Sequence, residues 1–272
     1  MRKALPRHTP RLVALAFAAM TLWSFVPGVS ALTDLTPAQA EAEVVRLLNQ
    51  QRGAVGVVAA RVDSRLTQIA RARSYDMATK HYFDHRQPDG RYVWDLLDAA
   101  RIRWYEVGED IAWNSWSTFR DSATGAATQW RNSAPHYAII TDRDFNYVGV
   151  GVAVEAGTGR KYWTAVFMKG PDRTGAWARM NSGILGTRTG YTRTVTVSWR
   201  GADVPLSVLT SGLYSFTVQK RIDGGVWNAP YTTTKTSWTG SLYRGHRYEY
   251  RVIARDRAGN YGGWSPLVTI LP

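Results

Sequence analysis

Hydrophobic positions in the first part of the chain repeat with the three-to-four-residue spacing of amphipathic helices. Residues 37–52 carry such a stripe, and Thr36 with the proline that follows it forms a typical helix start. A second helix is predicted to begin after the N-cap residue Asp63 and to end near His81 or Tyr82. Two further helices are predicted, at 92–100 and 117–132.

The pattern then changes to that of β-strands. Residues 147–154 and 161–167 are short segments of β-branched, aromatic and small residues, and the Gly-Thr-Gly turn at 157–159 joins them. Helices and strands that are mixed within one segment are typical of a layered α+β structure. We therefore expect a layered α+β structure in a first domain.

Helical spacing disappears toward the C-terminus. A stretch rich in Gly, Ser and Thr suggests a mobile linker at residues 170–190. Beyond it, polar and apolar residues alternate with period two, which predicts an all-β sandwich at residues 191–272. Its strands are predicted at 194–199, 214–219, 234–238 and 248–254.

The N-terminus has the composition of a targeting segment. Four basic residues precede an apolar run at 12–26, and small residues lead up to Ala31. This pattern predicts a signal peptide at residues 1–31 that is cleaved after Ala31, and hence a secreted mature protein with no transmembrane segment. The alternative is an uncleaved N-terminal membrane anchor.

Composition restricts the chemistry. The 272 residues are 44% hydrophobic, enough for two packed cores, and the absence of cysteine excludes thiolate zinc sites, thiol nucleophiles and disulfides. The net charge is +13, and residues 190–272 hold 10 basic against 4 acidic residues. For an exported protein this surplus favours an anionic cell-envelope polymer or lipid as partner; no base-reading motif points to nucleic acid. Solubility alone is the alternative explanation.

Several short motifs together carry a family resemblance. They are Arg71–Ala78 (RARSYDMA), Tyr82–Gly90 (YFDHRQPDG), Gly108–Ala112 (GEDIA), Trp130–His136 (WRNSAPH), Phe145–Gly151 (FNYVGVG) and Tyr162–Thr164 (YWT). In this order and spacing, residues 37–169 resemble the CAP superfamily of cysteine-rich secretory (SCP-like), antigen 5 and pathogenesis-related proteins, in the cysteine-free form common in bacteria. The resemblance implies that this first domain is arranged as an α-β-α sandwich. The C-terminal part resembles a fibronectin type III domain, through Trp199, Tyr250 and the ending at 254–260.

The CAP resemblance implies a site. In that family two histidines and a glutamate converge in a central cleft, and the matching positions here are His85, Glu109 and His136. Ser133 stands where the family has a second cleft glutamate, so a site of two histidines and two glutamates is not expected. Asp110 replaces the asparagine that usually follows the glutamate.

The trio allows three kinds of use. Two imidazoles and a carboxylate are suitable ligands for a divalent metal such as zinc, which would activate a bound water. Without metal, Glu109 could raise the pKa of a nearby histidine and form a general acid/base pair. The third interpretation is a hydrogen-bonded structural cluster without chemistry. The catalytic role of His85, Glu109 and His136 is therefore left open, with binding or structural use favoured over catalysis.

One competing motif is set aside. His81-x-x-x-His85 has metalloprotease spacing, but Tyr82 occupies the position of the required glutamate base. We interpret His81 as a cation near the C-terminal end of its helix.

Aromatic residues suggest further contacts. Trp113 and Trp116 follow the Glu109 motif and are expected, together with Ser133, at a ligand cleft. Trp199 and Tyr250 are predicted to lie in the core of the sandwich.

The favoured hypothesis is a secreted protein that binds a small, lipidic or cell-envelope ligand at the cell surface, with the basic sandwich as an attachment module. Sterol and lipid binding are known in CAP relatives, and the resemblance implies them as possibilities. The alternatives are a metal-dependent hydrolase of a peptide or cell-wall substrate, and a purely structural adhesion protein.

Overall fold

The structure is a computed structural model that describes residues 33–272. The predicted signal peptide at 1–31 lies outside the described residues. Among residues 33–272, no helix combines the length and the apolar character needed to cross a membrane.

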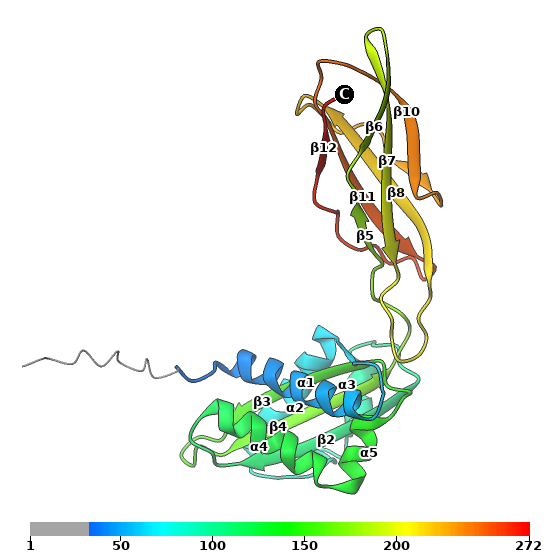
Figure 1. Ribbon diagram of the computed structural model, residues 1–272. Helices are drawn as coiled ribbons and strands as arrows, with labels where there is room; N and C mark the ends of the chain where they lie inside the picture. The colour runs from blue at the N-terminus through cyan, green and yellow to red at the C-terminus, as the bar shows by residue number, and fades with distance from the viewer. Residues whose placement is uncertain (1–32) are drawn as a thin grey trace, which may run out of the picture. The chain divides into compact units, whose positions relative to one another are not determined.

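The first domain is a four-stranded sheet with helices on both faces (Figure 1). The strand order is β1-β3-β4-β2; β1 runs parallel to β3, and the other pairs are antiparallel. The helices are α1 (Pro37–Ala54), α2 (Ser64–Lys80), α3 (Val93–Ala99), α4 (Phe119–Arg131) and α5 (Ala134–Thr141). The strands are β1 (Arg61–Val62), β2 (Glu106–Asn114), β3 (Tyr147–Val154) and β4 (Lys161–Lys169). The arrangement agrees with the expected layered α+β architecture.

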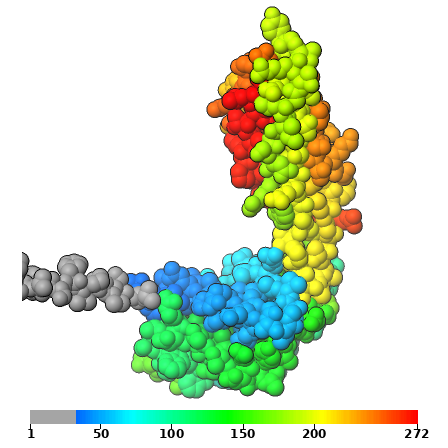
Figure 2. All heavy atoms as spheres, viewed as in Figure 1, coloured from blue at the N-terminus to red at the C-terminus, as the bar shows by residue number. Residues whose placement is uncertain are grey.

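Alternate residues of β3 face the two helical layers. Val148 and Val150 are buried in the core with residues of α1 and α4, whose side chains cover this face of the sheet (Figure 2). Gly149 and Gly151 face α2 on the opposite side, where a Cβ atom on either would lie 2.1–2.2 Å from the helix backbone. The lack of side chains at these two positions therefore lets α2 lie directly on the sheet.

Local signals predicted the helix starts correctly. Thr36 accepts a hydrogen bond from the Gln39 backbone N–H in a capping box, and Asp63 caps α2. Three elements of this domain, β1, β2 and α5, were not predicted. Strand β2 has helices on both faces and carries Glu109 and Asp110 in its middle, so no simple alternation marks it.

The second domain consists of two four-stranded sheets that share one core. One sheet contains β5 (Trp177–Met180), β6 (Ile184–Thr189), β7 (Thr192–Ala202) and β10 (Ser237–Tyr243). The other contains β8 (Leu213–Ile222), β9 (Tyr231–Thr233), β11 (Tyr248–Asp256) and β12 (Val268–Ile270). Trp199 and Tyr250 are both buried in the core between them, as expected.

Two expectations for this part need correction. Strands β5 and β6 lie within the range 170–190 that was expected to be a linker, because both pair with β7. The predicted strand at 234–238 spans the connection between β9 and β10, which belong to different sheets. Local alternation cannot reveal such a change of sheet, since the pairing partners are distant in the sequence.

An arginine and tryptophan ladder covers part of the second domain. The Arg251 guanidinium lies 4.1 Å from the ring centroid of Trp227 and 4.2 Å from that of Trp264. On Trp227 a second guanidinium, that of Arg221, lies 4.7 Å from the same centroid. Trp227 is partly exposed, and the stacked cations stabilise it at the surface.

The close approach of α2 to the sheet predicts that Gly151→Ala destabilises the protein. The new methyl group would meet the backbone of α2, so the helix must shift, at a cost of about 1–3 kcal/mol or more. Urea unfolding followed by circular dichroism measures this. Gly53→Ala is the matched control, because this helical glycine has no neighbouring atom within 4 Å of the added carbon. Equal stability of the two variants would contradict the packing argument.

Candidate functional site

A buried arginine organises the site. Arg73 lies on α2 with no exposed surface, and its Nε donates to Glu109 Oε1 at 2.9 Å. Its other guanidinium nitrogens donate to the Tyr82 hydroxyl at 2.6 Å and to the backbone carbonyls of Asp84 and His85 at 2.8 and 3.1 Å. Arg73 therefore joins three segments: the helix α2, the loop that carries His85, and the strand β2.

Glu109 holds His85 in a fixed orientation. The His85 Nδ1 lies 2.8 Å from Glu109 Oε2, while the other carboxylate oxygen is bound by Arg73. Glu109 is 8% exposed, whereas the side chain of His85 is half exposed. With Nδ1 engaged, Nε2 is the nitrogen of His85 that remains for a ligand. Both oxygens of Glu109 are already hydrogen-bonded.

His136 is held by a different partner. It lies in the first turn of α5, and its Nδ1 is 2.8 Å from the Ser133 hydroxyl oxygen. Burial, and next the nearby positive charge of His85, lower the pKa of His136 below its usual range. His136 is therefore neutral at pH 7 and, like His85, has its Nε2 nitrogen left for a ligand. Ser133, at the position of the family's glutamate, thus orients the histidine.

A cavity of about 610 Å³ adjoins His136. Its walls combine aromatic and aliphatic residues with polar residues from the end of β2, from α4 and from the start of α5. The principal lining residues are Phe83, Ile111, Trp113, Trp130, Ser133 and His136. At its rim, Trp113 is 41% exposed and stacks with the Arg160 guanidinium, 4.2 Å from the ring centroid.

One expected position, Trp116, lies elsewhere, and so does His81, which was not expected to be a ligand. Trp116 is outside the set that lines the cavity; its indole lies beside Gly125 of α4, and its carbonyl accepts a hydrogen bond from Lys161 Nζ. His81 has left-handed backbone geometry at the end of α2, and its Nδ1 lies 2.7 Å from Glu155 Oε1. This hydrogen-bonding contact with Glu155 accounts for His81 without any role in the site.

Ligand atoms of the predicted trio do not converge. Among residues 33–272, the one group of three acidic or histidine residues with ligand atoms within 4.8 Å of one another is Asp172, Asp203 and Asp256. These carboxylates accept backbone hydrogen bonds instead, Asp172 from Ser211 N–H at 2.8 Å and Asp203 from Gly212 N–H at 2.6 Å. These hydrogen bonds stabilise the ends of strands. At the histidine site, the groups left for a ligand are the two Nε2 atoms.

Sequence reasoning missed the role of Arg73. Arg73 lies on the apolar stripe of its helix. A charged residue on such a stripe indicates a buried partner of opposite charge. The identity of that partner could not be read from the sequence, because it depends on how α2 packs against β2.

Asp110, next to Glu109 on β2, is buried on the opposite face of the sheet. It has no exposed surface, and neither carboxylate oxygen has a hydrogen-bond partner among the described residues. Burial, and next the charge of Glu109, raise the pKa of Asp110 to about 8. Asp110 therefore keeps its proton at neutral pH and behaves as the neutral side chain that usually stands at this position.

The first part of the chain is similar to known proteins. Residues 45–167 match the family model described as CAP, the cysteine-rich secretory protein family. YkwD of Bacillus subtilis (strain 168), an uncharacterized protein, is 33% identical over 128 residues, which cover 47% of this chain and 46% of YkwD. YlbC, an uncharacterized membrane protein of the same strain, is 29% identical over 129 residues, 47% of this chain and 34% of YlbC. The match thus spans less than half the length of either relative.

One solved structure is similar to part of this chain. It is an extracellular protein containing a SCP domain from Bacillus anthracis str. Ames, with 23% identity and a TM-score of 0.43; the match covers 50% of this chain and 45% of that one. The matched family model and the layered fold support a CAP domain in the first part of the chain. The likeness of the second domain to fibronectin type III stays a prediction.

Asp110 predicts a specific pH dependence of stability. With a pKa near 8 in the folded protein and the ordinary 3.8 when unfolded, the folded state binds one more proton between these pH values. The contribution of Asp110 to the free energy of unfolding is complete below pH 4. As the pH rises to about 8 this contribution is lost, by at most about 1.4 kcal/mol per pH unit. Asp110→Asn abolishes this loss, so its stability relative to wild type should grow by a few kcal/mol from pH 4 to 8.

Urea unfolding at pH 4, 6 and 8 measures this difference. Glu106→Gln is the matched control, since it neutralises an exposed carboxylate on the same strand. Parallel stability curves for wild type and Asp110→Asn would show that Asp110 is ionised in the folded protein.

Proposed function

We propose that this is an extracellular protein whose CAP domain binds a small or lipidic ligand of the cell envelope. The observation that carries the proposal is the cavity beside His136. Its volume of about 610 Å³ lies in the range of ligand sites, and the combination of apolar walls with polar groups is typical of them. The ligand would lie against Phe83 and Trp113, with its polar end near Ser133 and His136.

Glu109 is better placed to orient His85 than to act as a general base itself. A general base needs an oxygen or nitrogen that is free to take a proton from water or substrate. Glu109 uses both oxygens, one toward Arg73 and one toward His85. Its position supports a role in orienting His85.

A second candidate function is metal binding. The donor set fits a divalent ion such as zinc: His85 and His136 each use Nδ1 for an internal hydrogen bond, which leaves Nε2 for the metal. Glu109 and Ser133 would then be the outer partners that fix the two imidazole rings. A bound ion would supply Lewis acidity and activate water, which is the requirement of the hydrolase hypothesis.

The cavity proposal predicts that filling the cavity abolishes ligand binding. Ser133→Phe would place a ring among the lining residues, and binding of the fluorescent fatty acid cis-parinaric acid should fall by about tenfold or more. Fluorescence titration of the purified protein measures it. Tyr75→Ala, an exposed aromatic residue on α2, is the control and should bind as wild type. Equal affinity in wild type and Ser133→Phe would overturn the cavity as the site.

The metal candidate predicts zinc binding that requires both histidines. Calorimetric titration should show one saturable site in wild type and none in His85→Ala or His136→Ala. Zinc affinity in Glu109→Gln should fall by about 10–100-fold, because the orienting carboxylate is lost. His246→Ala, in the second domain, is the control. Binding that survives in either site variant, or no binding in folded wild type, would reject the metal site and leave the cavity proposal standing.

A further inference from the structure

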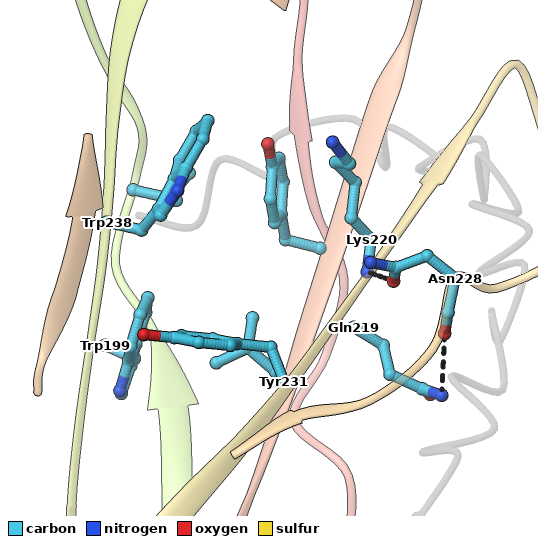
Figure 3. A pocket seen from close by; sticks show the side chains of 9 residues that line it. Trp199, Gln219, Lys220, Asn228, Tyr231 and Trp238 are labelled. Atoms are coloured by element: carbon cyan, nitrogen blue, oxygen red, sulfur yellow. Dashed lines mark hydrogen bonds between the residues drawn. The ribbon is translucent and has the colours of Figure 1, made fainter. Parts of the chain in front are cut away.

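A second pocket lies in the second domain, at the open edge between its two sheets. Strands β9 and β10 are edge strands of different sheets, and a cavity of about 250 Å³ lies between them. Trp199 and Trp238 line it from one sheet, and Tyr231, Lys220 and Tyr250 from the other (Figure 3). The pocket is thus built from both sheets and belongs to no part of the CAP domain.

The aromatic wall is held in place by a glycine. Trp238 and Gly240 are two residues apart on β10 and therefore lie on the same face of the strand. A Cβ atom on Gly240 would lie 2.3 Å from the indole ring of Trp238. The missing side chain lets the indole lie along the strand. Tyr231 is 50% exposed, so the pocket has aromatic surface that a ligand can reach.

Lys220 is an unusual residue for its position. On β8 it follows Phe216 and Val218 at every second residue, and both of these are buried in the core. A basic side chain therefore stands on the inward face of the strand, at the end of the apolar core. Among the described residues, Lys220 has no carboxylate within ion-pair distance. Its Nζ lies 5.9 Å from the centroid of the Tyr248 ring.

Two neutral polar groups accompany the lysine. Asn228 accepts the backbone N–H of Lys220 on its Oδ1 at 2.6 Å, which orients the amide and leaves its Nδ2 as a donor. Tyr250 is 3% exposed, and its hydroxyl has no hydrogen-bond partner among the described residues. Burial raises the pKa of Tyr250 above its usual range, so the hydroxyl remains a donor. A buried hydroxyl without a partner is destabilising, and an oxygen atom of a ligand would satisfy it.

We propose that this pocket binds a single sugar ring that carries a carboxylate. The flat indole of Trp238 matches the apolar C–H face of a pyranose ring, and the donors of Asn228 and Tyr250 match its oxygen atoms. Lys220 supplies the charge for the carboxylate. The volume is below the roughly 300–1,000 Å³ of sites for larger ligands, so it suits one ring. The inference concerns a second site and does not rest on the function proposed for the CAP cavity.

The probes are N-acetylmuramic acid and glucuronic acid, with N-acetylglucosamine and glucose as their neutral counterparts. Each is titrated into the purified full chain and followed by NMR signals of the tryptophan indoles. The acidic sugars should bind with millimolar dissociation constants, and the neutral ones at least about fivefold more weakly. Binding of neither acidic sugar to the folded protein, or equal binding of acidic and neutral sugars, would overturn the proposal.

Variants locate the site. Trp238→Ala should weaken binding by about tenfold or more, and Gly240→Ala should weaken it by displacing the same indole. Lys220→Met removes the charge but keeps an unbranched side chain that is one atom shorter, and it should remove the preference for the acidic sugar. Tyr243→Ala, an exposed aromatic residue on the same strand, is the control. Binding that persists unchanged in Trp238→Ala and Lys220→Met would place the sugar elsewhere; Ser133→Phe, which blocks the CAP cavity, should leave it intact.

Discussion

The buried ion pair between Arg73 and Glu109 is the interaction on which the candidate site depends. Both groups are removed from water, and the low polarity of their surroundings makes an unpaired charge there very costly. Removing one partner of such a pair costs about 3–5 kcal/mol. The pair is satisfied because the guanidinium also binds the carbonyls of the loop that carries His85. The position of that histidine therefore follows from the packing of α2 on the sheet.

The close contact of α2 with β3 is what makes this possible. Gly149 and Gly151 bring the helix onto the sheet, so that Arg73, further along the same helix, reaches Glu109 on the edge strand β2. A second buried arginine shows that burial alone does not specify such a site. Arg52 donates to the carbonyls of Val58, Ile140, Asp142 and Phe145, and burial lowers its pKa to about 10. Arg52 joins chain segments through their backbone carbonyls, whereas Arg73 also holds a carboxylate that orients a histidine.

This contrast indicates how far sequence reasoning reaches. Helix starts at Thr36 and Asp63, and the strand at 147–154, were predicted because capping and periodicity are local properties. Strand β2 was not predicted, since Glu109 and Asp110, which lie in its middle, remove its alternation. The pairing of β5 and β6 with β7 is non-local, and the exposed, Gly- and Thr-rich sequence of β6 gives no apolar signal for it.

The candidate site shows the same division. Family resemblance named His85, Glu109 and His136, and the structure brings the first two into direct contact. The resemblance could not show that both oxygens of Glu109 are hydrogen-bonded, because Arg73 becomes the partner of Glu109 only when α2 packs on the sheet. It also could not separate Trp113, at the cavity, from Trp116, beside α4. Residue types can be carried over from a motif, but the atoms left for a ligand depend on which hydrogen bonds the surrounding fold has already used. Here these atoms are the two imidazole Nε2 nitrogens, and any chemistry in the cleft has to start from them.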